Sequence, residues 1–215
     1  MRIAAALAVY FNCDGETILG DQGRYSYSES GRRSYFVSCL AHNTGFPSTR
    51  LDRGKIAAKR QLAASPAWQR HKGEYQVSAR IAFPQNSMGR GISIPQGESG
   101  FTVSDTLRGI QPMVLLWNIG PDVKHITTRE AAGDEGMRYE WVLYAQLNRQ
   151  YLLSIVVHPR IIGGNHSVEL LRGSSSPFLG WYAPRYLQCV PSTVIKLSVD
   201  CKDEDTVTMR IHRLD

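Results

Sequence analysis

The chain begins MRIAAALAVYFNCDGE (residues 1–16), a stretch that fits either a secretory signal or the first strand of a fold. An apolar run that follows Arg2 matches the charged start of a signal and its apolar core of about 7 to 15 residues. The apolar side chains also alternate from Ile3 to Phe11, as they do in a strand with one buried face. The run has no Ala-x-Ala-like cleavage site after it and ends at Asp14-Gly15, a pair typical of tight turns. We therefore predict a strand over residues 3–12.

The rest of the chain repeats this pattern. Short segments rich in valine, isoleucine, threonine and aromatic residues alternate with clusters of Gly, Pro, Asn, Asp and Ser. A length of 215 residues is enough to bury a full core in one domain. We predict a single all-β domain, residues 1–215, built as an antiparallel two-sheet β-sandwich with little helix. The further predicted strands are 16–21, 34–41, 75–83, 101–106, 112–118, 139–146, 151–157, 167–171, 193–199 and 206–213.

Three segments depart from the strand pattern. Residues 54–63, GKIAAKRQLA, are the one helical-looking segment, although they lack a clean apolar stripe. Residues 84–100 and 129–138 combine glycine, proline and polar residues, so we predict long surface loops there.

Composition limits the partners. The formal net charge of +6 favours an anionic partner such as an acidic polysaccharide, a nucleic acid or an anionic surface, but it does not choose among them, and ordinary solvated charge on a β protein is the simpler explanation. No apolar stretch reaches the roughly 18 residues of a membrane span, so we expect no membrane partner. The four cysteines have no C-x-x-C spacing. Cys189 and Cys201 could pair across strands or remain buried thiols, and the sequence leaves both open.

The candidate site lies in residues 16–44, ETILGDQGRYSYSESGRRSYFVSCLAHNT. Asp21 ends one predicted strand and His42 follows another, and a carboxylate oxygen and an imidazole nitrogen at neighbouring strand ends both suit zinc. An aspartate that caps a turn and a histidine bonded to a backbone carbonyl explain the same pattern without any metal. Basic and aromatic residues follow Asp21 closely: Arg24, Tyr25, Tyr27, Arg32 and Arg33.

Three segments resemble the heparinase II/III-like family of polysaccharide lyases. The first is DGETILGDQGRYSYSESGRRSYFVSCLAHNT (14–44), which is similar in order and spacing to a stretch of the family's C-terminal β domain. The second is VSDTLRG (103–109) followed by VLLWNIGPDV (114–123). The third, GWYAPRYLQCVPSTVIKL (180–197), is the most specific, and its aromatic residues also fit simple packing. The resemblance spans nearly the whole chain and supports the strand over residues 3–12.

The resemblance implies a function in β-elimination. In the family, the polysaccharide binds between this β domain and an α/α-toroid, and the toroid supplies the principal tyrosine, histidine and asparagine of the reaction. This chain has no toroid, so the resemblance implies no catalytic residue here and a protein that is incomplete or inactive alone. The implied partners are a uronate-containing acidic polysaccharide and either a separate toroid chain or a homo-oligomer, with no nucleic acid. A periplasmic or secreted location would follow the family, although the N-terminal stretch is not a convincing signal peptide.

Residue by residue, the resemblance implies a zinc site with one ligand missing. Asp21 and His42 match the family's metal-binding aspartate and histidine. The family's third ligand and a further active-site histidine fall near Met1, Ile3 and Ala5, none of which is a usual zinc ligand. In the tryptophan segment, Asn118 stands where the family often has histidine.

Two alternatives remain open. One is a non-catalytic module that binds acidic glycans through Arg24, Tyr25, Tyr27, Arg32 and Arg33. The other is a structural or oligomer-forming sandwich, which an exposed apolar edge would favour. An unrelated enzyme has little support, because the sequence has no G-x-S-x-G elbow, glycine-rich phosphate loop or H-E-x-x-H motif. The other histidines stand singly and are predicted to be structural or exposed: His71, His125, His158, His166 and His212.

Overall fold

The computed structural model describes residues 7–28, 31–51, 61–62, 66–130, 137–158, 165–201 and 203–214. The chain forms two compact units, each assembled from three stretches of sequence. Unit 1 contains Met1–Lys59, Pro112–Asp122 and Asn165–Asp200, and unit 2 contains Arg60–Gln111, Val123–Gly164 and Cys201–Asp215. The single domain predicted for residues 1–215 stays a prediction.

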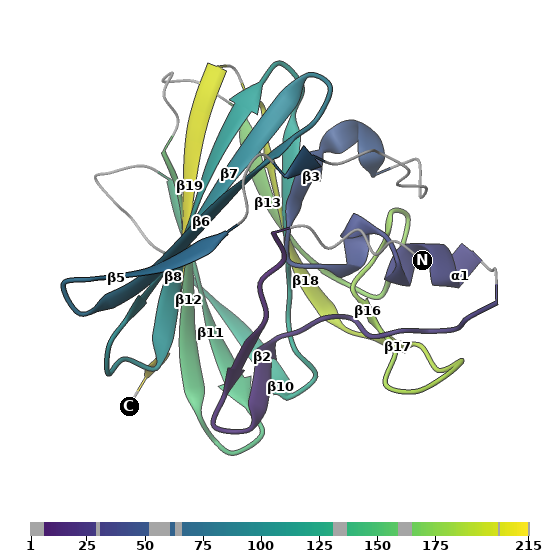
Figure 1. The fold of residues 1–215 in the computed structure, drawn as a ribbon. Coiled ribbons are helices and arrows are strands. Elements are labelled where there is room, and N and C mark those ends of the chain that lie inside the picture. The colour runs from purple at the N-terminus through teal and green to yellow at the C-terminus, as the bar shows by residue number, and fades with distance from the viewer. Residues whose placement is uncertain are drawn as a thin grey trace. The chain divides into compact units, whose positions relative to one another are not determined.

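Unit 2 is a nine-stranded antiparallel sheet with the order β10-β11-β12-β19-β8-β7-β6-β4, and β5 pairs with β6 beside β4. Figure 1 shows β6, β7, β8, β19, β12 and β11 running side by side. The bounds are β4 Gln61–Leu62, β5 Ala67–His71, β6 Glu74–Ala82, β7 Asn86–Pro95, β8 Gly100–Gly109, β10 Val123–Glu130, β11 Met137–Ala145, β12 Gln150–His158 and β19 Asp203–Leu214.

Alternation in the sequence explains the core of unit 2. Along β8, Val103, Asp105 and Leu107 are buried, whereas the residues between them lie on the more exposed face. Buried apolar residues also face each other across β12 and β19, as Ile155 and Met209 do. The regular two-residue period therefore fixes which face of this sheet is buried.

One pair of charges lies inside this apolar face. Arg90 of β7 and Asp105 of β8 are directly opposite in the register. The Arg90 Nε donates to Asp105 Oδ1 and its Nη2 donates to Asp105 Oδ2, both at 2.7 Å. Both side chains are almost completely buried. The two parallel bonds satisfy the planar guanidinium and the carboxylate together.

Unit 1 is built on a four-stranded antiparallel sheet with the order β13-β18-β9-β3. β9 is buried along its whole length, which explains why it reads as a continuous apolar run, MVLLW, closed by Asn118. The bounds of the unit's elements are β1 Phe11–Cys13, β2 Glu16–Leu19, α1 Gly31–Phe36, η1 Cys39–Ala41, β3 Gly45–Pro47, η2 Ser48–Arg50, β9 Met113–Asn118, β13 His166–Arg172, β14 Ser174–Ser175, β15 Phe178–Leu179, β16 Trp181–Tyr182, β17 Val190–Pro191 and β18 Thr193–Val199.

The structure confirms the all-β fold class with little helix and with antiparallel pairing in its named sheets. The tight turn at Asp14-Gly15 is also present: both residues have positive φ, at 51° and 86°, and the turn joins β1 to β2. The strand predicted over residues 3–12 is wrong for residues 7–10, because β1 begins only at Phe11, and residues 1–6 lie outside the described residues.

Two other predictions are wrong in type. Residues 34–41 form the end of α1 and η1 rather than a strand, since consecutive residues Tyr35 and Phe36 are both buried and break the two-residue period. The predicted loop at 84–100 contains the ten-residue strand β7. Its buried residues Met88 and Arg90 alternate with glycine and serine, which hid the strand pattern.

The remaining predicted segments are only partly described. Within 129–138, Arg129 and Glu130 end β10 and residues 137–138 begin β11, whereas 131–136 lie outside the described residues. Within the helical-looking segment 54–63, Gln61–Leu62 form strand β4 and the other residues are not described. Among the described residues, no helix is long and apolar enough to cross a membrane. All four cysteines are free thiols, and Cys39 and Cys201 are buried.

Candidate functional site

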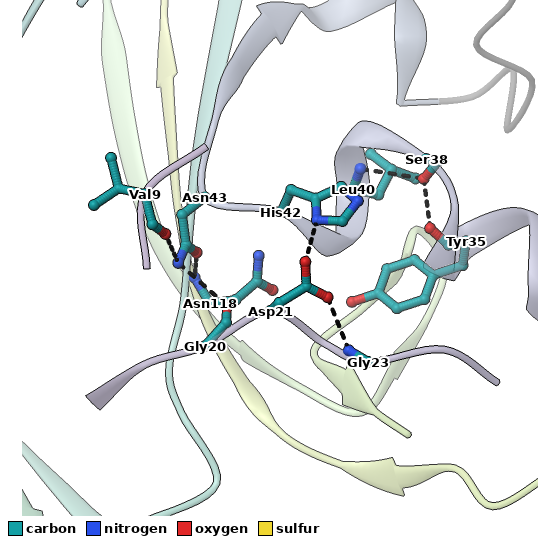
Figure 2. Close-up of polar contacts among 10 residues, drawn as sticks. All are labelled: Val9, Gly20, Asp21, Gly23, Tyr35, Ser38, Leu40, His42, Asn43 and Asn118. Atoms are coloured by element: carbon teal, nitrogen blue, oxygen red, sulfur yellow. Dashed lines mark hydrogen bonds and ion pairs between the residues drawn. The ribbon is translucent and has the colours of Figure 1, made fainter. Parts of the chain in front are cut away.

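Asp21 follows the end of β2 in unit 1. Its Oδ1 accepts a hydrogen bond from the Gly23 backbone N–H at 3.0 Å, which closes a tight turn. Gly23 is required there, because it has φ +80° and a Cβ on it would lie 2.5 Å from the Ala183 carbonyl oxygen. The turn holds the other carboxylate oxygen of Asp21 toward His42 (Figure 2).

His42 follows η1, whose Ser38 hydroxyl accepts from the Leu40 N–H at 3.1 Å and caps its start. The His42 Nδ1 lies 2.9 Å from Asp21 Oδ2, with the imidazole 3% exposed and the carboxylate 54% exposed. Burial raises the pKa of Asp21, but the hydrogen bond and charge of His42 and the Gly23 N–H outweigh it and lower the pKa below its ordinary value. The carboxylate is therefore ionised at neutral pH.

Asn43 fixes the backbone around this pair. Its Nδ2 donates to the carbonyl oxygens of Val9, at 2.8 Å, and Gly20, at 3.2 Å. Its Oδ1 accepts from the backbone N–H of Asn118 at 2.5 Å. The side chain thus joins the N-terminal segment, the segment that carries Asp21 and strand β9 at one point, next to His42 (Figure 2).

Several buried polar atoms of the site have no hydrogen-bond partner within the described part of the chain. They are His42 Nε2 and both side-chain amide atoms of Gln22 and of Asn118. All three residues are at most 2% exposed. Buried polar groups are normally paired, so such atoms indicate where a ligand, ion or water binds.

Tyr35 of α1 borders the same site. Its hydroxyl is 3.4 Å from the Trp181 carbonyl oxygen, and its ring packs edge-on against Phe178. Burial raises the pKa of the phenol well above its ordinary range, and the negative charge of Asp21 raises it further. The Tyr35 hydroxyl therefore remains protonated at neutral pH.

A surface of tyrosines and arginines follows Asp21 along the chain. The Arg24 guanidinium carbon lies 4.2 Å from the centre of the Tyr27 ring, and Tyr27 also stacks on Tyr186 with the ring centres 6.2 Å apart. The Arg32 guanidinium carbon lies 6.0 Å from the Tyr25 ring centre. We call Arg24, Tyr25, Tyr27, Arg32 and Tyr186 the tyrosine–arginine surface. Tyr27 and Tyr186 are more than half exposed, at 68% and 56%.

The structure brings most of the predicted site residues together. Asp21 meets His42, and Arg24 and Arg32 meet Tyr27 and Tyr25. Arg33 differs, because its Nε and Nη1 are buried and do not belong to the exposed surface. Met1, Ile3 and Ala5, where the family's third ligand and its further active-site histidine would fall, lie outside the described residues. The roles predicted for these residues stay predictions.

Sequence reasoning missed Gln22, Tyr35, Asn43 and Tyr186. Asn43 and Tyr186 stand within the segments that carry the family resemblance, so their position was a usable signal. Gln22 and Tyr35 stand in the first of these segments too, but their burial follows from tertiary packing, which leaves no local pattern in the sequence.

The donors present fit a divalent cation in part. Among the described residues there is no cluster of three or more His, Cys, Asp and Glu. Asp21 Oδ2 and His42 Nδ1, however, are 2.9 Å apart, so both can reach one zinc ion at ordinary bond lengths of about 2.0–2.2 Å. The unpartnered buried amide of Asn118 lies beside them and adds a polar group that a bound ion would satisfy (Figure 2).

The fold and this geometry define an antiparallel β protein with a carboxylate–imidazole pair and, close to its aspartate in sequence, a basic aromatic surface. Residues 4–207 match the family model for the heparinase II/III-like C-terminal domain. The chain therefore belongs to the heparinase II/III-like family through that domain.

Solved structures agree with this fold. Heparan sulfate lyase HepC from Pedobacter heparinus matches with a TM-score of 0.69 and 11% identity, over 97% of this chain and 30% of its own. A heparinase III gene product matches with a TM-score of 0.63 and 14% identity, over 94% and 29%. A further heparinase III structure gives 0.65 and 12%, over 94% and 28%. This chain thus spans less than a third of each of these proteins. A search of curated protein sequences found no match.

Proposed function

We propose that unit 1 forms one wall of the binding site for an acidic, uronate-containing polysaccharide in a lyase that acts by β-elimination. The observation that carries the proposal is the tyrosine–arginine surface, which begins three residues after the ionised Asp21 of the Asp21–His42 pair. Membership of the heparinase II/III-like family supports it, and the similarity to a heparan sulfate lyase suggests heparan sulfate as a first substrate to test.

The chemistry of this surface suits an acidic glycan. Arginine binds carboxylate and sulfate oxygens with strong charge-assisted hydrogen bonds, and exposed tyrosine rings offer flat faces to sugars. In β-elimination, negative charge spreads onto the uronate carboxylate as its neighbouring proton leaves. Arg24 and Arg32 would bind that carboxylate or a nearby sulfate and hold the chain in place. We assign no proton transfer to these residues.

We also propose a zinc site at Asp21 and His42. A bound zinc would supply a fixed positive charge at the edge of the glycan site. The residues of this chain would hold it there: Gly23 and Asn43 position Asp21 and His42 through the hydrogen bonds given above.

Retention on immobilised heparan sulfate tests the binding proposal. The 215-residue chain is expected to be retained and to elute with added NaCl, because the attraction is largely between charges. The double variant Arg24→Ala/Arg32→Ala should elute at clearly lower salt. The control Arg80→Ala/Arg138→Ala removes the same charge from exposed or partly exposed arginines of unit 2. Equal losses in the two double variants would overturn a specific surface in unit 1.

A second candidate function is a glycan-binding module without catalysis, because the same surface supports binding alone. Ultraviolet absorbance of the C4–C5 double bond distinguishes the two functions. We expect no such product from the chain alone, since the resemblance assigns the base and acid to the toroid. Product formed when a toroid-bearing partner is added would favour the lyase, and its absence with retained binding would favour the module.

A further inference from the structure

Asn118 ends the buried strand β9, and its side chain is completely buried. Two hydrogen bonds hold the backbone of Asn118 in place. The Asn118 N–H donates to Asn43 Oδ1, and the Asn118 carbonyl oxygen accepts from the Gly20 N–H at 3.0 Å. Asn43 and Gly20 directly adjoin His42 and Asp21 in sequence. The Asn118 side chain is therefore fixed beside the Asp21–His42 pair.

The Asn118 amide points toward the space that the Asp21 carboxylate and the His42 ring also face (Figure 2). Neither its oxygen nor its nitrogen has a hydrogen-bond partner in the part of the chain that the structure describes. A buried amide that is unpaired at both ends is costly, so a bound group that accepts its lone pairs would stabilise the protein.

We propose that Asn118 supplies the third protein ligand, through its amide oxygen, to a divalent cation held by Asp21 and His42. The donor set is then one carboxylate oxygen, one amide oxygen and one imidazole nitrogen. Rotation of the amide by half a turn exchanges oxygen and nitrogen, so the oxygen can face the ion. This set of donors replaces the usual third histidine or cysteine of a zinc site, and it binds zinc more tightly than Mn²⁺. The inference rests on the proposed zinc site and is independent of glycan binding.

Calorimetric titration with zinc chloride alone, without glycan, tests the inference. The parent chain should bind about one zinc ion, more tightly than manganese. Asn118→Leu keeps a similar volume but has no donor, and we expect zinc affinity to fall by about tenfold or more, since even outer-shell partners change metal affinity by about 10- to 100-fold. Asn118→His should raise zinc affinity and shift the visible absorption of bound Co²⁺, because a nitrogen donor replaces an oxygen.

Asn86→Leu is the matched control. Asn86 is a buried asparagine of unit 2 whose Nδ2 donates to the Gln111 carbonyl oxygen at 2.8 Å, so its loss should leave zinc affinity unchanged. Unchanged affinity in Asn118→Leu, or no zinc binding by the parent chain, would overturn the inference. Should Asn118→Leu not fold, an unchanged Co²⁺ spectrum in Asn118→His would overturn it as well. Retention on heparan sulfate, measured separately, reports on the proposed glycan site alone.

Discussion

One set of buried polar groups in each unit makes a contrast. In unit 2, Arg90 and Asp105 lie in the apolar face of a long, regular sheet and satisfy each other with two hydrogen bonds of 2.7 Å. In unit 1, the amides of Gln22 and Asn118 are buried but have no partner at either end among the described residues. The charge pair of unit 2 is fully satisfied within the core. The amides of unit 1 leave hydrogen-bond donors and acceptors without a partner inside the fold.

The two units also differ in the length and regularity of their strands. The longest strand of unit 2 runs from Asp203 to Leu214, whereas no strand of unit 1 within the described ranges exceeds the length of β13 or β18. Short elements joined by turns place side chains such as Asp21 and His42 where strand alternation alone would not. Regular structure supplies stability in unit 2, and irregular structure positions the residues of the candidate site in unit 1.

The largest expected effect comes from breaking the charge pair of unit 2. Arg90→Met leaves the Asp105 carboxylate buried without its partner, which typically costs about 3–5 kcal/mol of folding free energy. Urea unfolding followed by circular dichroism measures this loss. The double variant Arg90→Met/Asp105→Leu removes both charges and should recover most of it. A single variant that loses less than about 1 kcal/mol would show that the pairing in unit 2 is not needed for its stability.

A smaller loss is expected from Asn43→Ala in unit 1. The substitution removes three hydrogen bonds, to Val9, Gly20 and Asn118, and we expect a cost of about 2–3 kcal/mol, since a buried group left unpaired costs about 1–3 kcal/mol. Asn86→Ala, which loses one bond in unit 2, is the matched comparison. Equal unfolding midpoints for the two variants would contradict a special role for Asn43 in joining its three segments.

The fold was predictable where strands alternate regularly. Segments such as 75–83 and 193–199 agree with β6 and β18 to within one or two residues, because bulky apolar side chains recur every second residue there. β7 was missed, since glycine and serine fill its more exposed positions and no apolar contrast remains. α1 was missed because its short helix is set by the packing of Tyr35 and Phe36 and not by helix propensity.

The site was predictable only as residue types within a recognisable segment. Asp21 and His42 stood out, and the structure brings them within 2.9 Å. The sequence could not show that Asn118, ninety-seven positions after Asp21, faces the same space, because this depends on the pairing of β9 with β18 and on the hydrogen bond from Asn43. Long-range contacts of this kind do not leave a local pattern.

The smallest expected effect is a gain in stability, and it comes from replacing a buried, unpaired amide of unit 1. Gln22 is 1% exposed, and neither of its amide atoms has a partner in the described ranges. Gln22→Met keeps a side chain of similar length without burying an amide, so it should raise the free energy of unfolding by up to about 1 kcal/mol. Gln188→Met, at an exposed position of the same unit, should leave it unchanged. A clear loss of stability in Gln22→Met would instead mean that the amide binds a water or ligand inside unit 1. The buried amide of Gln22 would then belong to a hydrogen-bond network completed by that water or ligand, and it would not be an unpaired group.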